Sequence, residues 1–178
     1  MEAFKDIKVI VREEDNNSGL YEIAPLPRGY GHTLGNALRR ILYSSIKGSG
    51  ITAVKVKGAK HEYSTIDGVK EDVLSIILNL KQVKFKVDSE DVKTFKLVAK
   101  GKGVVKASDI QVDSGVTVTT PDVVLANITD ESGSLEIEMT VESGVGYKDA
   151  TKLDRNSEGL IPLDCDFTPI RSEERRVG

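Results

Sequence analysis

The chain has 178 residues, 39% of them hydrophobic and 30% charged, and its formal net charge at pH 7 is −3. This length suits one ordinary domain or two small ones that share strands, and no apolar run approaches the roughly 20 residues that a transmembrane helix needs. The net negative charge argues against a protein that binds nucleic acid through its own surface, because phosphate neutralisation leaves a basic footprint.

Most of the chain is predicted to form short strands, beginning with a hairpin. Residues 7–11 and 21–24 are strand-like, and the Asn-Asn-Ser-Gly cluster at 16–19 favours a turn between them. Apolar and polar residues alternate most regularly at 134–141, which indicates antiparallel sheets with one face toward solvent. Further strands are predicted at 51–56, 83–87, 94–99, 115–119 and 123–128.

The first of two predicted helices spans about residues 33–46. Its apolar residues follow the helical spacing i, i+3, i+4, i+7, i+8 and form one stripe. Arg39 and Arg40 flank this stripe, and Gly48 suits a left-handed cap after the last turn. The stripe consists of Leu34, Ala37, Leu38, Ile41 and Leu42.

The second predicted helix begins at about residue 67 or 69 and ends at Leu80. Leu74 and Leu78 lie opposite its main apolar stripe, so the helix needs cover on more than one side. That cover is either a sheet and a loop of the same chain or another subunit. The main stripe consists of Val69, Val73, Ile76, Ile77 and Leu80.

No set of residues predicts catalysis. His32 and His61 are too few and too far apart in sequence for a zinc site. Cys165 has acidic neighbours, which disfavour a thiolate. As the one cysteine it can form no internal disulfide, which indicates the reducing cytoplasm. The lysine-rich stretch 81–102 lacks an aromatic ladder for stacking bases, and we expect it to form the outer faces of strands.

Two blocks of sequence carry a family resemblance. Residues 28–42 read Arg-Gly-Tyr-Gly-His-Thr-Leu-Gly-Asn-Ala-Leu-Arg-Arg-Ile-Leu, and residues 61–65 read His-Glu-Tyr-Ser-Thr, followed at 68–73 by Gly-Val-Lys-Glu-Asp-Val. Both blocks closely resemble the amino-terminal assembly domain of the bacterial and plastid RNA polymerase alpha subunit. Weaker similarity at 125–131, 144–147 and 164–169 extends the resemblance over about residues 4–170.

The resemblance implies an α+β fold with two domains. A dimerisation domain of antiparallel strands and helix, residues 1–47 plus 164–170, is interrupted by an inserted, mostly antiparallel β domain with one long helix, residues 48–163. The glycines around Ser49 mark the predicted boundary. The segment 171–178 is either a genuine charged tail or, as we expect, not evolved protein, with the chain cut short before the helix that closes the family's dimerisation domain.

The resemblance also assigns interaction residues. The dimer core is expected on the first helix, at Tyr30, Leu34, Leu38 and Ile41. Large-subunit contacts are expected from His32, Gly35, Asn36, Arg39 and Arg40, and from His61, Glu62, Tyr63, Ser64 and Thr65. The guanidinium forks of the two arginines suit carboxylates or carbonyls on a large partner.

By resemblance, the chain is expected to be a non-catalytic scaffold subunit of DNA-directed RNA polymerase. Two copies would form a homodimer, one copy engaging the beta subunit and the other beta-prime, while nucleotidyl transfer takes place elsewhere in the enzyme. We expect no cofactor, no metal, no specific DNA binding by this chain and no membrane association, and a bacterial cytosolic location rather than the plastid stroma. The alternative is a stand-alone α+β ligand-binding or enzymatic domain whose pocket the sequence hides.

Overall fold

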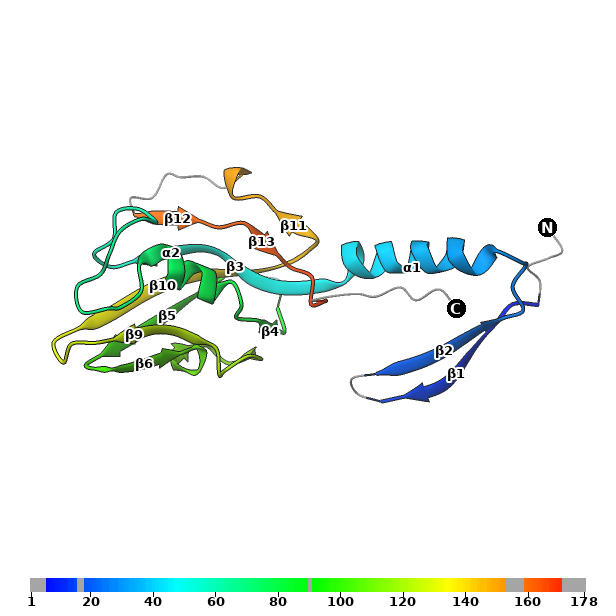
Figure 1. Cartoon of the computed structure of the whole chain (residues 1–178), viewed down its shortest axis with the longest axis horizontal. Helices are drawn as coiled ribbons and strands as arrows, with labels where there is room; N and C mark the ends of the chain where they lie inside the picture. The colour runs from blue at the N-terminus through cyan, green and yellow to red at the C-terminus, as the bar shows by residue number, and fades with distance from the viewer. Residues whose placement is uncertain (1–5, 16–17, 90, 153–158, 171–178) are drawn as a thin grey trace. The chain divides into compact units, whose positions relative to one another are not determined.

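The computed structural model describes residues 6–15, 18–89, 91–152 and 159–170. These residues form an α+β fold with antiparallel strand pairs and two α-helices, which confirms the predicted fold class (Figure 1). The chain divides into two compact units, Met1–Leu42 and Tyr43–Gly178. The predicted tail, 171–178, lies outside the described residues.

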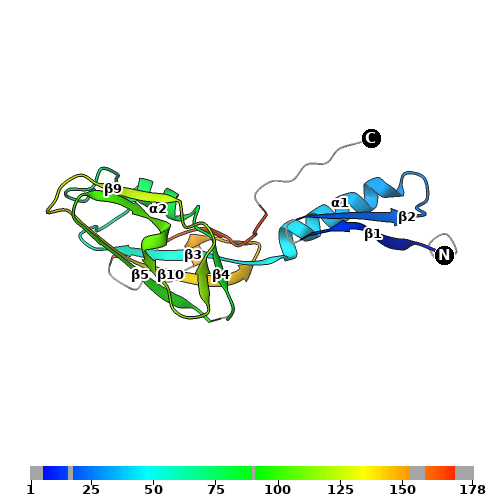
Figure 2. The same cartoon turned by 90° about the horizontal axis from the view of Figure 1, so that it is seen from below.

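The first unit contains a hairpin and most of the first helix. Strands β1 (Lys8–Glu14) and β2 (Gly19–Ala24) pair antiparallel, side by side in Figure 2, with a bulge between Val11 and Glu13. Helix α1 (Tyr30–Ser45) begins three residues before the predicted start. None of the described residues of these three elements is buried, so the unit has no core of its own.

The predicted left-handed cap at Gly48 is wrong. Helix α1 ends at Ser45, and Gly48 lies in strand β3 (Lys47–Val56) without a positive φ. The glycine serves close packing instead, because a methyl group there would overlap the carbonyl oxygen of Phe167. A methyl group on Gly50 would likewise overlap the sulfur of Cys165. The segment around residue 166 can therefore cross this strand closely only where side chains are missing.

The second unit is built on a five-stranded antiparallel sheet in the order β12-β3-β10-β5-β7. The register places Val54, Met139 and Phe95 opposite one another, and all three are buried on the inner face. The other four strands of this sheet are β5 (Lys93–Lys100), β7 (Ile110–Gln111), β10 (Ser134–Val145) and β12 (Leu160–Pro162).

Three two-stranded pairs complete the second unit. They are β4 (Phe85–Val87) with β8 (Val116–Val118), β6 (Gly103–Lys106) with β9 (Val124–Ile128), and β11 (Tyr147–Lys148) with β13 (Cys165–Asp166). Two short 3-10 turns, η2 (Ala107–Asp109) and η3 (Ala150–Lys152), join them to the sheet. Strands β6, β7, β11, β12 and β13 were not predicted, because runs of two to four residues show no period of their own.

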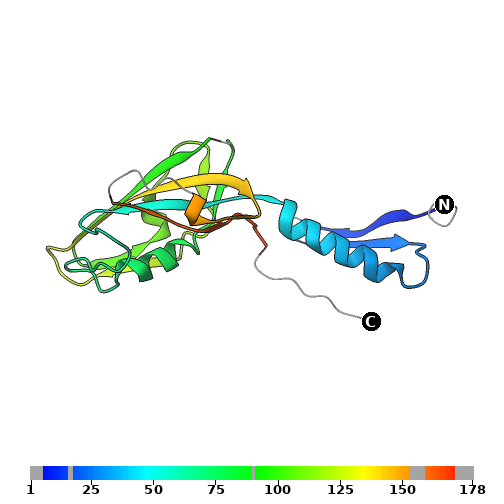
Figure 3. The same cartoon turned by 90° about the horizontal axis from the view of Figure 1, so that it is seen from above.

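Helix α2 (Val73–Leu80) lies along one face of the sheet (green in Figure 3) and closes the core. It begins later than predicted because the Asp72 carboxylate caps it, accepting a hydrogen bond of 2.8 Å from the backbone N–H of Ser75. Val69 therefore precedes the helix, half-buried against the same core. The remaining four stripe residues are buried as predicted: Val73, Ile76, Ile77 and Leu80.

Candidate interaction surfaces

The apolar stripe of α1 is open to solvent. Tyr30, Leu34 and Leu38 follow one another at i, i+4 and i+8, so they share a face of the helix. Leu34 is half-buried, whereas Tyr30, Leu38 and Ile41 are 40%, 43% and 55% exposed. The four residues expected in a dimer core thus remain largely uncovered in the single chain.

The hairpin presents a second apolar surface in the same unit. Its register pairs Val9 with Ile23 and Val11 with Tyr21, which puts these side chains on one face of the two strands. Val9, Val11 and Tyr21 are each at least half exposed. Exposed apolar surface of this extent is typical of a site that another element or chain covers.

The polar candidates of α1 lie along the same helix. His32, Asn36, Arg39 and Arg40 are all exposed. Gly35 lies inside the helix, where glycine costs about 1 kcal/mol relative to alanine. Its φ is not positive, and an added Cβ would meet no atom within 4 Å beyond the neighbouring residues and the backbone of the helix itself. The missing side chain at this position has no explanation within the described chain.

The segment 61–65 forms a surface turn organised by Ser64. The Ser64 Oγ accepts hydrogen bonds from the backbone N–H groups of Lys60 and His61, both at 3.3 Å, and lies 3.3 Å from the Nδ1 of His61. The Ser64 carbonyl accepts the N–H of Val73 at 3.1 Å, which ties the turn to the start of α2. Tyr63 is 72% exposed beside the His61 ring, and Glu62 is half-buried.

Thr65 is exposed at the end of this turn, and the residues that follow it anchor the turn to β9. Glu71 accepts two hydrogen bonds from Asn127, one from the backbone N–H at 2.6 Å and one from Nδ2 at 2.7 Å. The N–H of Lys70 donates to the carbonyl of Asn127 at 2.9 Å, and the N–H of Thr129 donates to the carbonyl of Gly68 at 2.8 Å. In the second sequence block, residues 61–65 therefore form a surface turn, and residues 68–71 hold that turn against β9.

The pKa of Glu71 reflects this anchoring. Partial burial works to raise it, but the hydrogen bonds from Asn127 and the charge of Lys70 more than offset the burial and hold it below its usual value. Glu71 belongs to the second family block, but the sequence indicated no role for it, because its hydrogen-bond partner Asn127 lies 56 residues away.

A metal site and an activated thiol are two kinds of chemistry that the described ranges do not support. No three His, Cys, Asp or Glu side chains in these ranges could hold a metal ion together. Burial raises the pKa of Cys165 to about 11, with Asp166 and Glu142 adding to the effect, so the thiol is not an activated nucleophile. Among the helices of the described residues, none is long and apolar enough to span a membrane.

Comparison with known proteins places the chain in a family. Residues 54–168 match the RNA polymerase Rpb3/RpoA insert domain, which is more than half of the chain. The chain belongs to the RNA polymerase alpha-subunit family. It corresponds to the amino-terminal domain of that subunit.

Relatives from several bacteria agree with this assignment. The chain is 46% identical over 178 residues to the DNA-directed RNA polymerase subunit alpha of Hydrogenobaculum sp. (strain Y04AAS1), covering 97% of this chain and 56% of the relative. It is 46% identical over 174 residues to that of Heliobacterium modesticaldum, covering 96% and 54%. For Rubrobacter xylanophilus the identity is 43% over 169 residues, covering 94% and 54%. The chain spans about half the length of the relatives it matches.

Within this alpha-family chain, the expected interaction residues fall in separate units. The α1 candidates belong to the first unit, whereas the turn at 61–65 belongs to the second. Helix α2 adds Leu74 and Leu78, which are 37% and 55% exposed on the face away from the core. The sequence left two explanations for this leucine pair, burial under a sheet and loop of the same chain or contact with another subunit. Among the described residues, no sheet or loop buries the pair.

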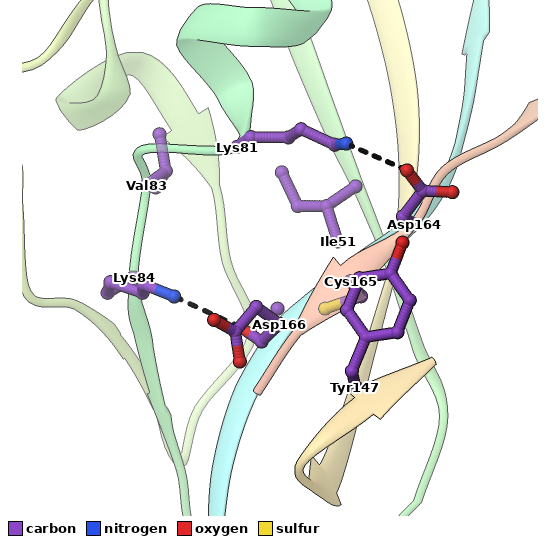
Figure 4. Close-up of a pocket in the computed structure, with 9 residues that line it drawn as sticks. Ile51, Lys81, Val83, Lys84, Tyr147, Asp164, Cys165 and Asp166 are labelled. Atoms are coloured by element: carbon purple, nitrogen blue, oxygen red, sulfur yellow. Dashed lines mark hydrogen bonds and ion pairs between the residues drawn. The ribbon is translucent and has the colours of Figure 1, made fainter. Parts of the chain in front are cut away.

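A small hollow of about 150 Å³ lies next to β13 (Figure 4). Lys81 points across it to Asp164, with an Nζ–Oδ2 distance of 3.7 Å, and the Lys84 Nζ donates to the Asp166 carbonyl at 3.2 Å. Tyr147 lies at its edge; burial and the nearby Asp164 raise the pKa of its hydroxyl. Because Lys81 and Lys84 already interact with Asp164 and with the Asp166 carbonyl, the hollow does not resemble a site for a charged substrate.

Proposed function

We propose that this chain is a non-catalytic scaffold subunit of DNA-directed RNA polymerase that dimerises and nucleates assembly of the beta and beta-prime subunits. The observation that carries the proposal is the first unit, where no described residue of β1, β2 or α1 is buried. A segment with an ordered apolar stripe and no core needs a partner to cover it. We propose this enzyme because the three relatives described above are alpha subunits of DNA-directed RNA polymerase.

The dimer contact is proposed along α1, with Tyr30, Leu34, Leu38 and Ile41 at its centre. These side chains share one face of a four-turn helix, so a second copy can bury all of them at once. We also propose the family's domain organisation for this chain, with dimerisation residues 1–47 and 164–170 around an inserted domain at 48–163. The match to the insert-domain family at 54–168 supports an inserted domain over most of 48–163, although it also includes residues 164–168.

The large-subunit contacts are proposed at two places. On α1 they are His32, Gly35, Asn36, Arg39 and Arg40. Here the side-chain-free Gly35 allows a partner backbone to approach closely, and the arginines offer bidentate hydrogen bonds.

The second place is the turn at His61, Glu62, Tyr63, Ser64 and Thr65. Exposed tyrosines of this kind often contribute much of an interface's binding energy. The hydrogen bonds that anchor this turn lower the entropic cost of binding, because the loop is already ordered.

Sedimentation tests the dimer part of the proposal. Ile41→Asp should abolish self-association of the chain, because the charge would enter the proposed contact. Val104→Asp is the matched control: Val104 is 56% exposed, much like Ile41, but lies on β6 of the other unit. Equal loss of self-association in both variants, or none in either, would refute the assignment of α1.

Capture of purified beta subunit tests the second part. Tyr63→Ala should weaken capture about 30-fold, since interface hot spots of this kind contribute about 2 kcal/mol. Tyr147→Ala is the control, since Tyr147 is 66% exposed but lies outside the turn. If the wild-type chain captures neither large subunit, the scaffold function is wrong.

A further inference from the structure

A hollow of about 290 Å³ lies beside the turn at 61–65. Its lining comes from the chain after β3 (Lys57 and Gly58), from the last residue of the turn and the two that follow it (residues 65–67), and from the start of β10 (Ser134 and Glu136). Pockets for small molecules begin at about 300 Å³ and are lined mostly by apolar groups. This hollow lies at the lower limit of that range and carries three charged groups, which suits one polar side chain of a protein partner.

The charges in the hollow are not fully matched. The Lys57 Nζ donates to Glu136 Oε2 at 2.7 Å, and this hydrogen bond holds the pKa of Glu136 below its usual value. The Lys57 side chain is 75% exposed, however, and exposed ion pairs contribute little and exchange partners readily. None of the ion pairs found among the described residues includes Asp67. Lys96 and Lys100 also act on Glu136 through space, but neither lines the hollow. Among the lining residues themselves, two carboxylates face one amine, with the Thr65 hydroxyl as a further acceptor.

The sides of the hollow are held in place by backbone contacts. The N–H of Lys57 donates to the carbonyl of Glu136 at 3.0 Å, and the N–H of Val69 donates to the carbonyl of Ile66 at 3.1 Å. Gly68 has a φ of +77° and packs against Gly133, so closely that a Cβ on Gly68 would lie 3.0 Å from the Gly133 Cα. The backbone segments that carry the two carboxylates are therefore held in place before any partner binds, which lowers the cost of ordering the site.

We propose that this hollow receives an arginine side chain of the large subunit that binds the neighbouring turn. The planar guanidinium carries five N–H donors, enough for Asp67, Glu136 and Thr65 together, and it loses less hydration than an ammonium group. On entry it displaces Lys57 from Glu136, and the lysine then returns to solvent. The proposal rests on the scaffold function above, because it assumes that the 61–65 turn meets that subunit.

Neutralising the two carboxylates tests the proposal. Asp67→Asn and Glu136→Gln should each weaken binding of purified beta subunit about 10-fold at physiological salt, mainly through faster dissociation. Asp113→Asn is the matched control, because it removes one exposed acid from the turn after β7. Circular dichroism and the melting temperature show that each variant is folded.

The Lys57→Met substitution should change the affinity for the beta subunit in the opposite direction. Removing the amine frees Glu136 and lowers the repulsion of an incoming cation, so binding should tighten several-fold. Weaker binding on Lys57→Met would show that the partner presents an acid here and would overturn the proposal, as would wild-type affinity in both carboxylate variants. If the wild-type chain binds no large subunit, the scaffold function itself fails, which is a different result from normal binding that ignores these three charges.

Discussion

Replacing Glu71 with Gln should loosen the turn at 61–65 and destabilise the second unit. The carboxylate accepts two hydrogen bonds from Asn127, at 2.6 and 2.7 Å. Hydrogen bonds to a charged group contribute about 1.5–3 kcal/mol each. Glutamine keeps one acceptor, but its NH₂ group would face the other donor.

The expected loss from Glu71→Gln is about 2 kcal/mol in the free energy of unfolding, because one of the two charge-assisted bonds goes and the site is only partly buried. For a chain of this size, that corresponds to a melting temperature lower by about 4–8 °C. Urea unfolding monitored by circular dichroism measures the difference. Glu131→Gln, which neutralises an exposed acid in the turn between β9 and β10, is the control and should match the wild type.

The pH dependence provides a second test of the Glu71 contact. The folded-state pKa of Glu71 lies below its usual value, so its contribution is fully present above the unfolded pKa of about 4.3 and is lost as the pH falls through the folded pKa. The wild type and Glu71→Gln should therefore differ at pH 7 and converge in acid. A gap that is unchanged at about pH 3, or no gap at pH 7, would refute the role assigned to this carboxylate.

Three further predictions concern binding and titration. Arg40→Ala should weaken capture of the beta subunit by about 2–5 kcal/mol with the fold intact, and Arg39→Ala less so; co-purification at wild-type yield would contradict this. The chain should give no sequence-specific band shift with duplex DNA at physiological salt, because its net charge is −3. Cys165, with a pKa of about 11, should react slowly with a thiol reagent at about pH 8 until the chain unfolds. Because this pKa is raised, stability should fall more steeply in the wild type than in Cys165→Ser as pH rises from about 8.5 toward 11.

Local patterns were enough to predict the two helices and the longer strands. The stripe of α1 and the buried face of α2 repeat over two turns or more, so the period is visible without knowing what covers it. Strand β10 spans 12 residues, and its alternation was readable for the same reason. The family blocks were recognisable too, since each is a contiguous run of residues.

Helix ends and short strands depended on capping and pairing contacts rather than on a repeating pattern of residues. The late start of α2 follows from the Asp72 cap and from the pairing of Val69 with Ile128. Strand β13 has two residues and exists because it pairs with β11. Gly48 was predicted as a helix cap from its position after a helix, but the crossing segment at Phe167 requires the glycine.

The sequence by itself determined the family, the fold class and the identity of the exposed helix stripe, because these depend on runs of adjacent residues. Only the tertiary structure revealed the anchoring of Glu71 on Asn127 and the hollow that joins Lys57, Asp67 and Glu136. Glu71 and Asn127 are 56 residues apart, and Lys57 and Glu136 are 79 residues apart. Contacts over such separations are set by which strands pair and in which register. The register in turn follows from burying one face of each strand in a shared core, which no local pattern specifies.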